Sequence, residues 1–157
     1  MSKNYGKIFE EQIKKSVSPD MYYLRIKDST MRFKGDSNIC DCFIFYNRTC
    51  FMLELKSSQE TSLPFGNIKE HQFNGLMDAG KIDGIEAGLL VEMRRYKETY
   101  FVPIKDAMEY KNSTTRKSFS RDFLIEKGIK LEQTLKRTRY VFNIEKLLND
   151  ILNKGDL

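Results

Sequence analysis

The chain has 157 residues, of which 40% are hydrophobic and 31% are charged, and its formal net charge is +5. This length suits one domain with a substantial core, so we expect a single domain over residues 1–157. No run of about 18 apolar residues is present, and no apolar segment follows Met1, so we expect a cytoplasmic protein without a membrane span or signal peptide.

The net charge and the numbers of cysteine and histidine residues limit which partners and metal sites the protein can have. A positive net charge permits a polyanionic partner such as nucleic acid but does not require one. Cys40, Cys42 and Cys50 lack Cys-x-x-Cys spacing, which is typical of small buried side chains in a reducing compartment. His71 is the only histidine, which excludes a histidine-rich metal site.

The first third of the chain predicts one helix followed by three strands. Tyr5, Phe9, Ile13 and Val17 recur every four residues, which predicts an amphipathic helix over 4–17 that ends before Pro19. A polar turn around Gly35 and a tight hairpin at 47–49 separate the strands. We expect these strands over 21–27, 41–46 and 50–57.

The remainder predicts an alternation of helices and strands. After a loop over 58–67, Asn67 is expected to cap a helix that runs from 68 to 79 and closes at Gly80. Strands are expected over 85–93 and 98–104, with a polar hinge at 94–97, and helices over about 104–110, from Ser120 to Gly128, and over 144–152 after Asn143. The basic, Ser/Thr-rich tract 111–122 is expected to be exposed. This order predicts an α/β fold with a mixed sheet.

Two carboxylates lie within otherwise apolar strands. Because side chains alternate across a strand, Glu54 and Lys56 share a face, and the hairpin brings Asp41 beside them. Adjacent carboxylates raise one another's pKa, and a divalent cation such as Mg²⁺ or Mn²⁺ removes that cost. A lysine beside the ion can position water or stabilise charge on a phosphate, which is typical of metal-dependent phosphodiesterases. The alternative is a purely structural Asp–Lys–Glu network at the end of the sheet.

The wider context of these residues resembles a known family. Asp41 followed by Glu54-Leu55-Lys56 resembles the Asp…(Asp/Glu)-x-Lys core of the restriction-endonuclease-like nuclease superfamily. Within it, segment 61–72 (TSLPFGNIKEHQ) and the start Asn4-Tyr5-Gly6…Phe9-Glu10 resemble the RecU-type Holliday junction resolvases, over roughly residues 4–104. The resemblance implies one nuclease domain with a restriction-endonuclease-like α/β fold, a central mixed sheet flanked by helices.

The resemblance also implies roles for individual residues. Asp41 and Glu54 would bind Mg²⁺, for which Mn²⁺ can substitute, and Lys56 would be the catalytic lysine. Glu10 would be an additional acidic metal ligand, with an exposed helix charge as the alternative. Gln72 would hold the attacking water or a phosphate oxygen, with helix capping as the alternative. The neighbouring His71 is expected to be structural or a minor DNA contact.

The sequence departs from the family pattern at two places. Ile39 stands where the family usually has a hydroxyl residue two positions before the catalytic Asp, so any such hydroxyl would come from Ser37. The interval 22–40 is too short for the long stalk insertion that engages the junction centre in the bacterial proteins. We therefore expect a short form whose means of junction selection is an open question.

The expected partner is branched DNA, bound by a homodimer. A C2 dimer would present two equivalent sites to a four-way junction, with the apolar face of helix 144–152 or the first helix as the interface. The alternatives are a general or trimming DNA nuclease of the same fold, and a DNA-binding module whose acidic cluster is structural. Phosphate contacts are expected from cations, with Arg137 and Arg139 as substitutes. These cations are Lys3, Lys7, Lys14, Arg32, Lys34, Arg116 and Lys117.

Overall fold

The computed structural model describes residues 2–27 and 38–154. The expected turn around Gly35 lies outside these residues, as do Ser37 and the two cations Arg32 and Lys34. None of the helices in the described part of the chain is long and apolar enough to cross a membrane.

A six-stranded mixed sheet forms the centre of the molecule, in the order β1-β2-β3-β5-β6-β8. Only β3 and β5 pair in parallel, and the other neighbours are antiparallel. The strands are β1 (Tyr22–Arg25), β2 (Cys42–Tyr46), β3 (Thr49–Ser58), β5 (Ile85–Met93), β6 (Glu98–Pro103) and β8 (Ile129–Leu131). The expected α/β architecture with a mixed sheet is therefore confirmed.

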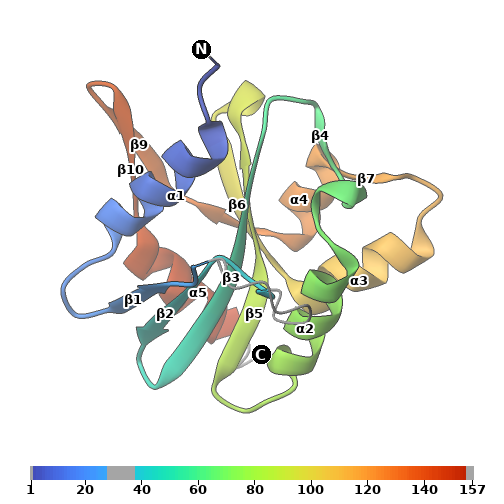
Figure 1. The fold of residues 1–157 in the computed structure, drawn as a ribbon, viewed down its shortest axis with the longest axis horizontal. Helices are drawn as coiled ribbons and strands as arrows, with labels where there is room; N and C mark the ends of the chain where they lie inside the picture. Colours follow the sequence, from blue (N-terminus) through green and yellow to red (C-terminus); the bar gives the residue numbers. More distant parts are fainter. Residues whose placement is uncertain (1, 28–37, 155–157) are drawn as a thin grey trace.

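Helices cover both faces of this sheet (Figure 1). One face packs against α1 (Tyr5–Ser16), α5 (Ile144–Lys154) and the hairpin of β9 (Gln133–Lys136) and β10 (Arg139–Phe142). The other face packs against α2 (Glu70–Gly80), α3 (Ile104–Ser113) and α4 (Arg121–Lys127). Because β3 and β5 are covered on both faces, their apolar residues belong to two separate hydrophobic cores, one on each face of the sheet.

Several connections contain short elements that the sequence pattern did not predict. β4 (Ser62–Pro64) pairs with β7 (Ser118–Ser120), and η1 (Phe65–Asn67) and η2 (Arg94–Tyr96) are single 3-10 turns. Asn67 belongs to η1, and Lys69 precedes the first residue of α2, so the expected capping by Asn67 is wrong. Strands of three residues leave too little alternation to detect in a sequence.

Two expectations about exposed surfaces are also wrong. The tract 111–122 is not wholly exposed, because Phe119 is buried among Phe65, Tyr110 and Phe123. Tyr5 and Ile8 of α1 are exposed, so an interface at the first helix stays a prediction. The apolar face of α5 and the buried residues of α1 pack onto the sheet, so the α5 face is not available to a second subunit. These buried residues are Phe9, Ile13, Ile144, Leu147, Leu148 and Ile151.

The segment that leads into β2 is fixed against α2 by one close contact. Ile39 packs on the backbone of Gly75, where a Cβ atom would lie 2.2 Å from Ile39 Cγ2. Ile39 thus has a packing role at the position where the family usually carries a hydroxyl. Because Ile39 lies two residues before Asp41, this contact also holds Asp41 in place.

We predict that Gly75→Ala destabilises the protein, although alanine is the better helix former. The gain in helix propensity is at most about 1 kcal/mol, whereas overpacking against Ile39 costs about 1–3 kcal/mol. Because the approach to Ile39 Cγ2 is as close as 2.2 Å, we expect a cost in the upper part of this range, and urea unfolding should show a net loss of about 1–2 kcal/mol. Gly66→Ala is the control, because a Cβ there meets nothing within 4 Å and the free energy of unfolding should hardly change. A Gly75→Ala protein as stable as the wild type would contradict this packing.

Candidate active site

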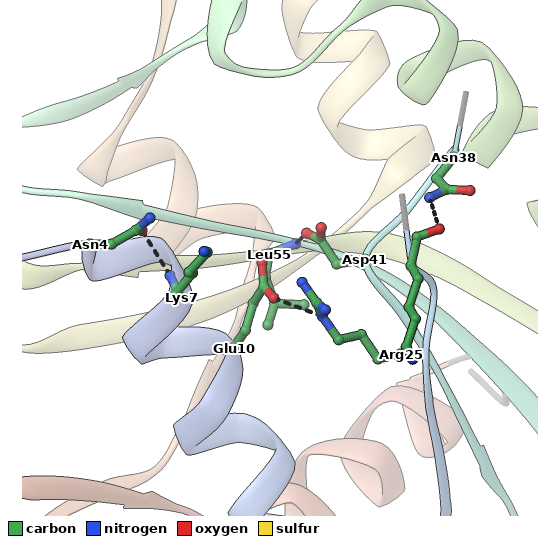
Figure 2. A network of polar contacts seen from close by, with 8 residues as sticks. Asn4, Lys7, Glu10, Arg25, Asn38, Asp41 and Leu55 are labelled. Atoms are coloured by element: carbon green, nitrogen blue, oxygen red, sulfur yellow. Dashed lines mark hydrogen bonds and ion pairs between the residues drawn. The ribbon is translucent and has the colours of Figure 1, made fainter. Parts of the chain in front are cut away.

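Asp41 lies directly before β2, where the ladder between β2 and β3 becomes irregular. Cys42 pairs with Leu53, and the Asp41 backbone N–H also donates to the Leu53 carbonyl at 3.0 Å. Two consecutive residues thus oppose one, which is the geometry of a β-bulge. The Leu55 N–H donates to Asp41 Oδ2 at 2.7 Å, so the carboxylate takes the place of a main-chain acceptor (Figure 2). The bulge therefore fixes the Asp41 side chain against the strand that carries Glu54 and Lys56.

Glu54 is a buried carboxylate on the central strand β3. Its side chain is only 1% exposed, and Lys56 Nζ lies 3.0 Å from Glu54 Oε2. Glu54 Oε1 is buried and has no hydrogen-bond partner among the described residues. Burial, followed by the neighbouring Asp41 carboxylate, raises the pKa of Glu54 to about 8, against a lowering by Lys56. The structure therefore brings together Asp41, Glu54 and Lys56.

This pair of carboxylates fits a divalent cation. The orphaned Oε1 of Glu54 lacks the partner that a buried carboxylate oxygen normally has, and Asp41 adds a second oxygen donor beside it. Mg²⁺ is commonly held by one or two carboxylates together with waters and substrate phosphates. Within the described residues, no group of three or more acidic, His or Cys side chains forms a metal-binding cluster. Among the described residues, Asp41 and Glu54 are therefore a pair that could hold an ion.

Glu10 lies on α1 close to this site but has a cationic partner. Arg25 Nε donates to Glu10 Oε2 at 3.3 Å, and Figure 2 shows both side chains beside Asp41 and Leu55. Arg25 is a site residue that the sequence pattern did not reveal. It reaches the site because β1 pairs with β2 and sets residue 25 opposite Cys42, a register that is not visible in the local sequence.

Gln72 contributes to the first turn of α2. Its Oε1 accepts a hydrogen bond from the Lys69 N–H at 3.0 Å, so the capping alternative is present in the structure. The Nε2 donors of the same amide are the part that could meet a water or a phosphate oxygen. The neighbouring His71 is exposed.

The expected DNA-contacting cations fall into two groups. Lys7 and Lys14 are exposed on α1, Lys3 is exposed just before its N-cap, and Lys7 appears near Glu10 in Figure 2. Arg116 and Lys117 are exposed before β7, on the opposite side of the sheet from α1. Lys7 is thus the cation of this set that lies beside the acidic site, and the two groups of cations lie on opposite sides of the sheet.

We predict that Glu54 makes the metal-free protein less stable as the pH rises from about 4.5 to about 8. The Glu54 carboxyl loses its proton near pH 4.5 in the unfolded chain, but only near pH 8 in the folded chain. Between these pH values, ionisation stabilises the unfolded state alone, so the free energy of unfolding falls. Urea unfolding between pH 4 and pH 9 without divalent ions should show the decline, and Glu54→Gln should flatten it. Parallel pH profiles for the wild type and Glu54→Gln would contradict the buried carboxylate.

Comparisons with known proteins give relatives for both the sequence and the fold. The chain is 30% identical over 172 residues to the SPbeta prophage-derived uncharacterized protein YotM of Bacillus subtilis (strain 168), covering 96% of this chain and 88% of that protein. Its fold is similar to Hjc of Archaeoglobus fulgidus, a Holliday junction resolvase from an archaeal hyperthermophile. That match has a TM-score of 0.56 and 16% identity over 79% of this chain and 93% of that chain.

The family assignment rests on a match that spans most of the sequence. Residues 14–146 match the model of the RecU family, which is described as Recombination protein U. This segment includes Asp41, Glu54, Lys56 and Gln72. The chain therefore belongs to the RecU family.

Proposed function

We propose that this protein is a metal-dependent endonuclease that resolves four-way DNA junctions. The observation that carries the proposal is the buried Glu54 carboxylate, with one orphaned oxygen, between Asp41 and Lys56. A purely structural network would satisfy both oxygens of a carboxylate that is only 1% exposed. Membership of the RecU family and the likeness to an archaeal junction resolvase support junction DNA as the substrate.

The proposed reaction is in-line hydrolysis of a phosphodiester. Water attacks the phosphorus, the bond to the 3′ oxygen breaks, and the products carry a 5′ phosphate and a 3′ hydroxyl. Asp41 and Glu54 would hold Mg²⁺, which when bound supplies positive charge to the phosphate and acidifies a bound water. Mn²⁺ has similar ligand preferences and is expected to substitute.

The chain's own residues have distinct tasks in this proposal. Lys56 keeps a positive charge beside the scissile phosphate, where charge develops in the transition state. Gln72 donates through Nε2 to the attacking water or to a phosphate oxygen. Arg25 holds Glu10 at the site, where Glu10 would be an additional acidic ligand of the ion. Lys3, Lys7 and Lys14 contact backbone phosphates along α1.

We predict that Asp41→Asn and Glu54→Gln each lower the cleavage rate at least about 10²-fold, roughly 2.7 kcal/mol of barrier, while DNA binding persists. The assay compares a four-way junction, a fork and a linear duplex in Mg²⁺, with binding followed by fluorescence anisotropy. Glu109→Gln, an equal change of charge on exposed α3, is the control and should cleave normally.

The same assay separates the alternatives. Comparable cutting of the junction and the linear duplex would favour a general or trimming nuclease of this fold. Binding without cutting in any divalent ion would favour a non-catalytic DNA-binding module. Undiminished cleavage by Asp41→Asn or Glu54→Gln would remove the site assignment.

A homodimer completes the proposal, since a junction offers two equivalent strands to cut. A surface that suits a second copy is the outer end of the sheet, where Tyr22 and Leu24 of β1 and Phe45 of β2 are 63%, 41% and 42% exposed. Tyr22 pairs directly with Phe45, and Leu24 pairs with Phe43, so these side chains form one apolar patch on one face. We call Tyr22, Leu24, Phe43 and Phe45 the β1–β2 patch.

We predict that Phe45→Lys converts the dimer to a monomer, because a C2 contact places the new charge on both sides of the interface. Light scattering after size-exclusion chromatography measures the mass. Leu135→Lys, which replaces a 59% exposed leucine on β9 far from the β1–β2 patch, is the matched control and should leave the mass unchanged. A Phe45→Lys protein that remains dimeric would place the interface elsewhere.

A further inference from the structure

A polar row of side chains follows the last apolar row on the α1-facing side of the sheet. Neighbouring strands β3, β5 and β6 first contribute a buried apolar row, which consists of Leu55, Leu90 and Phe101. Two residues further along the same strands, the paired positions are Ser57, Glu92 and Thr99. Because side chains two apart share a face, this polar row continues the core face beyond the point where the core ends.

One member of the polar row, Glu92, lines a pocket, and we call Glu92 and Gln133 the floor of this pocket. Ser57 and Thr99 support the floor from behind, because Ser57 hydrogen-bonds to Glu92 and Thr99 hydrogen-bonds to Gln133. The volume of the pocket is about 280 Å³, and α1 and the β9–β10 hairpin close it on two sides. Tyr5 and Gln12 come from α1, and Gln133 and Tyr140 come from the hairpin. Lys3, Arg94 and Lys97 add three cations, against the single acid Glu92. The pocket is therefore net positive, and Glu92 lies at its base.

Arg94 is fixed as a flat cationic wall of this pocket. Its Nε donates to Ser57 Oγ at 3.0 Å, and its Nη1 donates to Gln59 Oε1 at 3.2 Å. Its guanidinium carbon lies 3.8 Å from the centre of the Tyr5 ring. A guanidinium plane held in this way can stack against a planar ligand without losing further side-chain freedom.

Polar groups at the floor lack a full set of partners. Gln133 Oε1 accepts from the Thr99 hydroxyl at 2.7 Å, but Gln133 Nε2 is buried without any hydrogen-bond partner in the described part of the chain. Glu92 is only 6% exposed, and its Oε1 accepts from Ser57 Oγ at 2.7 Å. Burial raises the pKa of the Glu92 carboxyl. A ligand that fits this floor offers an acceptor for the amide beside a donor for the carboxylate.

The pocket and the active site share two elements. Ser57 follows Lys56 directly on β3, so the two residues are about 3.3 Å apart along the backbone and their side chains project from opposite faces. On α1, Lys7 and Glu10 lie by the acidic site, whereas Tyr5 and Gln12 line the pocket. A nucleic acid strand that follows the α1 cations would therefore pass both places.

We propose that this pocket, built around Glu92, Arg94 and Gln133, binds one unpaired nucleobase of the DNA substrate, with Lys3 and Lys97 on the adjoining phosphates. The proposal rests on the proposed nuclease function. The Watson–Crick edge of a base presents donors and acceptors side by side, which suits the Gln133 amide and the Glu92 carboxylate. The flat face of the same base can stack on the guanidinium plane of Arg94. The volume of about 280 Å³ lies near the lower end of ligand pockets, which suits a single base and excludes a base pair.

The test uses binding without cleavage. The full chain carrying Asp41→Asn, without divalent ions, is titrated with five single-stranded pentanucleotides of equal charge, four with a different central base and one with an abasic centre. We expect at least one base to bind about tenfold more tightly than the abasic strand. Adding Gln133→Met should abolish that difference while leaving the abasic affinity unchanged. Lys3→Gln should weaken all five strands equally and reduce the salt dependence.

Controls make each outcome decisive. Glu126→Gln, on exposed α4 at the cavity between α3 and α4, should behave like the parent. If Gln133→Met lowers the melting temperature by several degrees, Gln12→Leu repeats the test from the opposite wall. Equal affinity for all five strands, or base discrimination that survives both Gln133→Met and Gln12→Leu, would overturn the proposal. Base-dependent binding, combined with a wild-type chain that cleaves no DNA in Mg²⁺ or Mn²⁺, would instead refute the nuclease function and leave the pocket standing.

Discussion

The placement of a charged carboxylate inside the central strand is the constraint on which the site depends. Glu54 lies on β3, which has neighbours on both sides and helices on both faces, so water cannot solvate its side chain. An isolated buried charge is costly, and Lys56 compensates only one of the two carboxylate oxygens. An apolar residue at position 54 would pack with less cost, so the carboxylate has to serve a purpose other than stability.

Several features of the fold hold this costly arrangement in place. The bulge at Asp41 gives up a regular ladder position, and the Asp41 carboxylate then accepts the Leu55 N–H in its place. The segment before the bulge is fixed by Ile39 against Gly75. Residues 39–41 are therefore held at one end by packing on α2 and at the other end by hydrogen bonds to β3. The Asp41 carboxylate consequently has little freedom to move away from Glu54.

The sequence predicted the long periodic elements and the local pairing, because both follow from side-chain periodicity and from one tight turn. The strands that carry Asp41, Glu54 and Lys56 were located to within one or two residues, and alternation alone put Glu54 and Lys56 on one face. Arg25, Glu92 and Gln133 were not foreseen, since each acquires its environment from strand order or from the distant β9–β10 hairpin. The three-residue strands and the burial of Phe119 were missed for the same reason, because contacts between segments far apart in the chain decide them.

The two faces of β3 have different chemical characters near its end, and this suggests how a short family member could read DNA structure without a long insertion. On the α2-facing side, Glu54 and Lys56 provide the groups that suit phosphate chemistry. On the α1-facing side, Ser57 begins a polar row that suits a base. A paired base in a continuous duplex cannot leave its partner without losing stacking and pairing energy, whereas a base beside a branch point has already lost part of it. A pocket for a single base next to the cutting site would therefore favour branched DNA over linear duplex through the energy of unpairing.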